Sequence, residues 1–189
     1  MRDVEVLEYA TKTGALLEGH FLLRSGLHSR QFFQGALLLA DTDAASKVCG
    51  ALAERFKSVE CTTVISPAIG GIVAGQEVGR QLGKRAIFAE KDADDNLILR
   101  RGFKIEKGEK ILVIEDVITR GGRVQQTIDL VREHGGEVVG VGVIVDRSGG
   151  AATFDVPVLE SLVQLQIETF EPDSCPMCAE GSTAYKHGS

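Results

Sequence analysis

Tryptophan is absent from the 189-residue chain, and cysteine and proline occur only four times each. Four cysteines are too few to staple a chain of this length, and 43% hydrophobic residues allow a core without disulfide bonds. Asp and Glu (27) outnumber Lys and Arg (21), and the net charge of −6 argues against a nucleic-acid-binding protein. Long apolar runs and a signal-like start are also missing. We therefore expect a cytoplasmic, single-domain protein over residues 1–189, with neither nucleic acid nor membrane as a partner.

Short apolar strands alternate with amphipathic helices between about residues 43 and 150. Continuous apolar strands separated by helices indicate a parallel sheet that is covered on both faces. The expected class is therefore α/β, with a central, mostly parallel sheet flanked by helices. Strands are predicted at 63–65, 85–89, 110–114 and 137–145, and helices from Asp43 as a cap, from 66–71 to about Leu82, and from Val124 to His134.

The two ends of the chain have a different pattern from this core. Residues 3–17 have a ragged apolar face that predicts a helix, and residues 19–39 are typical of two short strands around the turn 24–26. We expect residues 1–40 and 151–189 to form a small hood over the core of about 43–150.

Three polar clusters follow predicted strands, at residues 66–71, 115–123 and 146–147. Ligands of parallel sheets bind beyond the carboxyl ends of the strands, so these clusters should meet at one site. The charged segment between Glu90 and Gly102 has few apolar residues and is interpreted as a mobile surface loop.

The segment 111–123 carries the strongest chemical signal. A buried strand leads to Glu115 and Asp116, and Thr119 then precedes the glycine pair Gly121 and Gly122 at a helix start. Adjacent carboxylates can accept hydrogen bonds from ribose hydroxyls. Glycines let backbone N–H groups approach a phosphate, whose charge the helix N-terminus favours. The segment is thus suited to a sugar phosphate, whereas a glycine pair alone would indicate only a turn.

This segment resembles the motif of type I phosphoribosyltransferases that binds phosphoribosyl pyrophosphate (PRPP), which implies that family's fold. The resemblance implies that Glu115 and Asp116 hold the ribose hydroxyls and that residues 119–123 surround the 5′-phosphate. Arg120 and Arg123 depart from the small or hydroxyl residues common in the family, and Arg can pair with phosphate directly. The implied PRPP-binding set is Lys91, Glu115, Asp116, Val117, Ile118, Thr119, Arg120, Gly121, Gly122 and Arg123.

The segments 12–16, 19–29 and 32–33, with Val145-Asp146-Arg147, resemble orotate phosphoribosyltransferases, which make orotidine 5′-phosphate in pyrimidine (UMP) biosynthesis. Orotate is a flat ring with a carboxylate, which an Arg fork can hold and an aromatic ring can stack on. The candidate orotate-binding residues are Thr119, Arg147, Arg24 and Phe33, with Phe32 as the alternative to Phe33 because neighbouring strand residues face opposite ways. A transferase for another base and a non-catalytic regulator that senses PRPP remain alternatives.

The pyrophosphate end of the site is less well matched. Residues 66–71 stand where the family places a backbone loop, and Lys91 matches a catalytic lysine that the family contributes from the neighbouring subunit. The resemblance therefore implies a homodimer with shared active sites. It also implies Mg²⁺ as cofactor, bound mainly through PRPP and without dedicated protein ligands.

Cys175 and Cys178 near the carboxyl terminus have the spacing of a zinc-binding pair. One pair supplies only two of four ligands, so His187 or a second subunit would have to complete the set. A reduced structural pair is the interpretation that the sequence favours.

Overall fold

A computed structural model describes residues 3–23 and 25–187. Six described strands form the main sheet in the order β5-β4-β3-β6-β7-β8, and all neighbours in it are parallel except β4 and β5. The expected mostly parallel sheet is confirmed. Its strands are β3 (Thr63–Pro67), β4 (Arg85–Lys91), β5 (Leu97–Leu99), β6 (Lys110–Ile118), β7 (Glu137–Asp146) and β8 (Leu159–Gln164).

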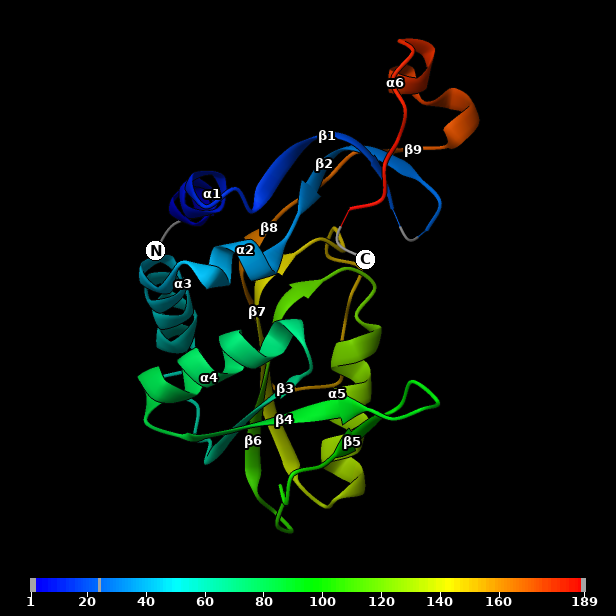
Figure 1. The fold of residues 1–189 in the computed structure, drawn as a ribbon. Coiled ribbons are helices and arrows are strands. Elements are labelled where there is room, and N and C mark those ends of the chain that lie inside the picture. The colour runs from blue at the N-terminus through cyan, green and yellow to red at the C-terminus, as the bar shows by residue number, and fades with distance from the viewer. Residues whose placement is uncertain (1–2, 24, 188–189) are drawn as a thin grey trace.

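Helices cover both faces of this sheet, as Figure 1 shows. On one face, α3 (Thr42–Arg55) and α4 (Gly70–Leu82) pack against Val64, Leu112 and Ile114. On the other, α5 (Gly122–Glu133) packs against Ile65, Ile111 and Val113. Successive strand residues point to opposite faces, so these continuous apolar strands supply both cores.

Helix α3 begins at Thr42, two residues earlier than a cap at Asp43 would place its start. Asp41, and not Asp43, caps it: the Asp41 carboxylate accepts hydrogen bonds from the backbone N–H groups of Asp43 (3.1 Å) and Ala44 (3.0 Å). At the far end of α3, fully buried Phe56 lies against Gly142 of β7, where any Cβ would come within 2.7 Å of its ring. This close approach explains why Gly142 interrupts the β-branched apolar residues of β7.

The amino-terminal region differs from the prediction in its boundaries. The helix expected over 3–17 is α1 (Asp3–Lys12), and it ends before Gly14, which has a positive φ of 69°. The two expected strands are β1 (Leu16–Leu22) and β2 (His28–Phe33), and the short helix α2 (Gly35–Ala40) was not predicted.

Residues from both ends of the chain form a second sheet beside the core. It has the order β1-β2-β9, and β9 (Thr169–Phe170) is followed by a 3₁₀ turn (Pro172–Ser174) and α6 (Pro176–Ala179). The tail then returns to β1, where the Leu22 N–H donates to the Tyr185 carbonyl at 2.8 Å. In Figure 1 the red tail accordingly lies next to the blue β1 strand. None of the helices formed by the described residues has the length and apolar character of a membrane span.

The charged segment 90–102 was expected to be a loop and is instead largely a hairpin. β5 pairs antiparallel with β4, and the turn between them is closed by the Asp92 N–H, which donates to the Asn96 carbonyl at 2.9 Å. Leu97-Ile98-Leu99 is an apolar run of only three residues, which is too short to indicate a strand from the sequence.

Candidate active site

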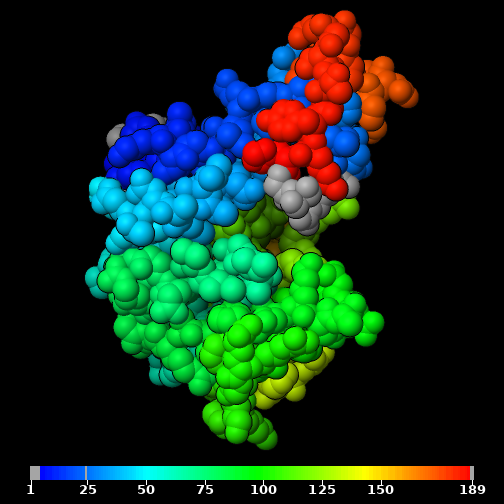
Figure 2. Space-filling model, in the orientation of Figure 1, coloured from blue at the N-terminus to red at the C-terminus, as the bar shows by residue number. Residues whose placement is uncertain are grey.

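The three polar clusters meet at the carboxyl edge of the main sheet. β6 is paired in parallel with both β3 and β7, so the segments that follow these strands emerge side by side. Figure 2 shows the surface hollowed between this edge, in green, and the hood, in blue and red. This is where an open parallel sheet binds ligands.

Glu115 and Asp116 lie at the centre of this edge. The Asp116 N–H donates to the Glu115 carboxylate at 3.1 Å, and the Val117 N–H donates to the Asp116 carboxylate at 2.9 Å. Glu115 is only 7% exposed, and its burial, together with the charge of Asp116, raises the pKa of its carboxyl well above the ordinary value. The raised pKa favours the neutral form of Glu115, which can donate as well as accept hydrogen bonds with the hydroxyls of a sugar.

Three glycines leave room for the acidic pair. A Cβ on Gly70, at the start of α4, would lie 2.9 Å from the Asp116 carboxylate, and one on Gly71 would lie 2.8 Å from that of Glu115. Gly35, at the start of α2, is packed even more tightly against Asp116. The sequence had indicated a backbone loop at 66–71, but Gly35 was missed because only the fold brings α2 to this edge.

The loop after β6 has the geometry of a phosphate-binding turn. Gly121 has a positive φ of 78° and precedes α5, whose N-terminus therefore opens onto the loop. Thr119, Arg120 and Gly122 are exposed around this turn, whereas Ile118 is buried in the core and holds the loop in place. The side chains of Val117 and Ile118 pack in the two apolar cores, so these residues offer a ligand chiefly their backbone.

Arg123 is already engaged by the hairpin turn. Its guanidinium pairs with the Asp95 carboxylate at 2.5 Å and also donates to the Asp95 carbonyl at 2.9 Å and to Gln126 at 2.6 Å. Lys91 pairs with the same Asp95 at 2.7 Å. The two predicted cations thus share one acidic partner, which connects the hairpin turn to the start of α5.

Arg147 joins the loop to the hood. The backbone N–H of Arg147 donates to the Ile118 carbonyl at 2.8 Å, and the guanidinium carbon of Arg147 lies 6.0 Å from the centre of the Phe32 ring. Burial lowers the pKa of this guanidinium, and its Nε is buried without a hydrogen-bond partner among the described residues. A buried, unpaired Arg donor beside an aromatic ring is suited to a flat anion.

The structure separates the two neighbouring phenylalanines. Phe33 is 4% exposed and belongs to the core on the α3 side, whereas Phe32 is partly exposed beside Arg147. Phe33 therefore faces the core, and Phe32, the alternative that strand alternation left open, is the ring that lies beside Arg147. Arg24, the remaining orotate candidate, lies outside the described residues.

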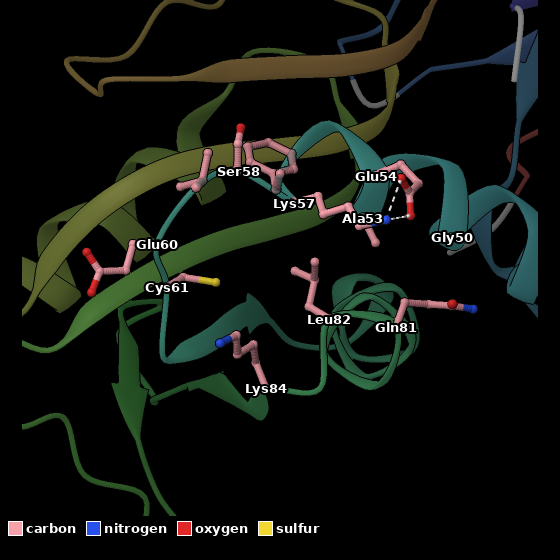
Figure 3. A pocket seen from close by; sticks show the side chains of 12 residues that line it. Gly50, Ala53, Glu54, Lys57, Ser58, Glu60, Cys61, Gln81, Leu82 and Lys84 are labelled. Carbon is pink, nitrogen blue, oxygen red and sulfur yellow. Dashed lines mark hydrogen bonds and ion pairs between the residues drawn. The ribbon is translucent and has the colours of Figure 1, made fainter.

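A separate cleft of about 430 Å³ lies between the carboxyl ends of α3 and α4 (Figure 3). Glu54, Lys57, Cys61, Gln81 and Lys84 are among its lining residues. Cys61 precedes β3 and Lys84 precedes β4, so the cleft is at the amino ends of the strands, opposite the acidic pair. Its position makes it a poor candidate for the active site.

Comparisons with known proteins give the family to which the chain is similar. Residues 38–171 match the phosphoribosyl transferase domain family. Orotate phosphoribosyltransferase of Caldicellulosiruptor bescii is 52% identical over 177 residues, covering 94% of this chain and 92% of the relative, and that of Desulforamulus reducens is 48% identical over 189 residues, covering 100% and 98%. The crystal structure of orotate phosphoribosyltransferase from Aeropyrum pernix superposes with a TM-score of 0.71 at 25% identity, covering 85% of this chain and 93% of that one.

Proposed function

The chain belongs to the phosphoribosyltransferase family, and we propose that it transfers the phosphoribosyl group of PRPP to orotate, which yields orotidine 5′-phosphate and pyrophosphate for UMP synthesis. The observation that carries the choice of base is Arg147: a buried guanidinium next to Phe32, bonded through its backbone to the sugar-phosphate loop. Relatives named orotate phosphoribosyltransferase that match along the whole chain support the same choice.

Different residues at the sheet edge would bind different parts of the two substrates. Glu115 and Asp116 would hold the ribose hydroxyls, and the turn 119–123 with the α5 N-terminus would hold the 5′-phosphate. Arg147 and Phe32 would orient orotate, with Thr119 between the base and the phosphate. This arrangement positions N1 of orotate for attack on C1 of the ribose.

The transfer itself breaks the bond from C1 to the pyrophosphate oxygen as the bond from N1 to C1 forms. Positive charge develops on the ribose ring, and the neighbouring carboxylate of Asp116 stabilises it. Lys91 would neutralise the departing pyrophosphate after exchanging its partner Asp95 for the substrate.

Mg²⁺ fits the chemistry of this edge. Glu115 and Asp116 offer carboxyl oxygens at this edge, and Mg²⁺ prefers oxygen ligands and retains several waters. When bound with PRPP, mainly through the substrate's own oxygens, the ion would supply charge neutralisation on the pyrophosphate.

A homodimer with shared sites is part of the proposal. Leu37, Ile69 and Val73 are exposed apolar side chains on α2 and at the start of α4, the two elements that meet at Asp116. We expect a second copy to cover these side chains and to contribute its Lys91 to the site. The four free cysteines fit the cytoplasmic location that the sequence indicates.

Mixing two inactive variants tests the shared sites. If Lys91 acts in the partner's site, equal amounts of Lys91→Ala and Asp116→Asn chains, dissociated and reassociated, should recover about a quarter of wild-type activity, since half of the dimers would contain one intact site of two. If Lys91 acts within its own chain, every hybrid site lacks one residue and no activity returns.

The choice of base is tested by product analysis with orotate, adenine and hypoxanthine as competing acceptors. Orotidine 5′-phosphate should be the dominant product, and Arg147→Ala should raise the KM for orotate while leaving PRPP binding within about threefold, because one charge-assisted bond to the base contributes about 1.5–3 kcal/mol. If a purine nucleotide were the main product, the acceptor would be a purine base and not orotate. PRPP binding without any product would instead indicate a regulator.

A further inference from the structure

Two histidines of the hood and the two tail cysteines converge on one point. His20 of β1, His28 of β2, and Cys175 and Cys178 around α6 place one ligand atom each within 4.8 Å of one another. His20, His28 and Cys175 are buried, and Cys178 is exposed. None of the four contributes to the proposed transfer, so the cluster needs a separate explanation.

The spacing within the cluster fits a tetrahedral metal. A zinc ion with bonds of about 2.3 Å to sulfur and about 2.0 Å to nitrogen holds a sulfur and a nitrogen ligand about 3.5 Å apart. Cys175 Sγ lies 3.5 Å from His20 Nε2, and Cys178 Sγ lies 3.8 Å from His20 Nε2 and 3.4 Å from His28 Nδ1. The two nitrogens are 2.9 Å apart and would separate by about 0.4 Å around the ion.

A further contact orients His20 for this role. Its other ring nitrogen, Nδ1, lies 3.1 Å from the Ser182 hydroxyl, which follows α6 in the chain. Histidines that bind a metal through one nitrogen usually donate the other N–H to a neighbouring oxygen, which fixes the tautomer and the ring orientation. Ser182 thus leaves the Nε2 lone pair directed at the two sulfurs.

We propose that His20, His28, Cys175 and Cys178 bind one structural Zn²⁺, which fastens the carboxyl-terminal tail to the β1–β2 hairpin. The other anchors of the tail are weak: β9 is two residues long, and two backbone hydrogen bonds join Tyr185 to His20 and Leu22 of β1. From the 3₁₀ turn to His187 only Cys175 and Met177 are buried, and the ion pair of Glu180 with Arg30 is exposed. A closed set of four N and S ligands stabilises small segments that lack an apolar core. A disulfide between the cysteines would leave both imidazoles without a role.

His187, the third ligand considered from the sequence, lies elsewhere. Its ring packs against Phe32 at 5.1 Å and against Phe21 at 5.9 Å between ring centres. The tail that the metal would fasten therefore covers Phe32, the ring beside Arg147. This consequence rests on the proposed function, whereas the metal site itself does not.

Metal content and cobalt spectroscopy test the site without an activity assay. Protein dialysed against a slight excess of Zn²⁺ and then desalted should retain one zinc per chain. Replacement by Co²⁺ should give the visible bands of tetrahedral cobalt and a thiolate charge-transfer band in the near ultraviolet. Cys178→Ala, which removes the exposed ligand, should lose these bands. Cys61→Ala, at a buried cysteine outside the cluster, and His187→Ala, at the other tail histidine, should keep them.

Alkylation gives an independent readout on the wild-type chain. Zinc should slow iodoacetamide labelling of Cys175 and Cys178 at least about tenfold, because a coordinated thiolate is a poor nucleophile. No retained zinc, octahedral cobalt bands, iron in place of zinc, or a mass two hydrogens lighter from a Cys175–Cys178 disulfide would each overturn the proposal. If zinc binds but its removal leaves the KM for orotate unchanged, the metal site stands and the inferred effect of the tail on Phe32 is refuted.

Discussion

Gly70→Ala is the substitution that tests the geometry of the acidic pair most sharply. The new Cβ would lie 2.9 and 3.0 Å from the two carboxylate oxygens of Asp116 and 3.1 Å from its Cγ. Contacts this short force the carboxylate to move. The movement would weaken its 2.9 Å hydrogen bond from the Val117 N–H and displace it from the ribose hydroxyls.

The expected effect of Gly70→Ala on stability follows from two opposing contributions. Alanine favours a helix over glycine by up to about 1 kcal/mol, and overpacking of this kind costs about 1–3 kcal/mol. The free energy of unfolding should therefore fall by about 0–2 kcal/mol, which leaves the chain folded. The loss should appear in function, as a fall in kcat/KM for PRPP of about 10- to 100-fold, which corresponds to about 1.4–2.8 kcal/mol of transition-state stabilisation.

Gly50→Ala is the matched control for this experiment. Gly50 also lies in a helix, but its Cβ would meet Gln81 at an ordinary 3.5 Å. It should retain full activity and gain about 0.5–1 kcal/mol of stability. Steady-state kinetics with PRPP varied, together with urea denaturation of both variants, makes the comparison. The reasoning is refuted if Gly70→Ala keeps kcat/KM within twofold of wild type while folding normally.

Three further predictions concern the same edge. The pKa of Glu115 is raised in the folded chain above its ordinary value of 4.5, so its contribution to stability is complete below that pH and is lost as the pH rises through the folded pKa. Urea denaturation across a pH series should therefore show that, above pH 4.5, the free energy of unfolding of wild type falls relative to that of Glu115→Gln. The difference should grow by at most about 1.4 kcal/mol per pH unit. If the free energies of unfolding of the two proteins followed parallel curves against pH, the raised pKa would be contradicted. Phe32→Ala should raise the KM for orotate about tenfold with little change in stability, whereas Phe33→Ala should lower the free energy of unfolding by about 3–5 kcal/mol; equal effects of the two on stability would count against their separate roles. Lys91→Ala should lower kcat about 100-fold and shift Tm very little, because its exposed ion pair with Asp95 contributes less than about 1 kcal/mol. Lys47→Ala, which removes a similar exposed pair with Asp43, is its control and should leave kcat unchanged.

The main sheet was predictable because its strands are long, apolar and separated by clear helix signals. The strand predicted at 110–114 extends further, to Ile118, since Val117 and Ile118 continue the ladder with Val145 and Asp146 of β7. The acidic pair is therefore held inside a strand, which explains its burial. Polar residues within a strand carry no periodic signal, so only the partner strand reveals this extension.

The site could be predicted wherever it lies in one segment of the chain. The turn 119–123 follows β6 and Arg147 follows β7, so both lie at the carboxyl edge of the sheet, as the order of the predicted strands indicated. Gly35 and the cluster of His20, His28, Cys175 and Cys178 could not be found in the same way, because about 150 residues separate the histidines from the cysteines. Their meeting depends on how the tail returns over the β1–β2 hairpin, and short strands such as β9 leave almost no trace in the sequence.

The most direct test of the account is the ultraviolet absorbance of orotate after mixing with the purified protein, PRPP and Mg²⁺. The account predicts a fall in absorbance that requires both PRPP and Mg²⁺ and that Asp116→Asn slows by about 100-fold or more, because the carboxylate acts on the ribose in the transition state. An unchanged absorbance with wild-type protein, or an undiminished rate in Asp116→Asn, would contradict it.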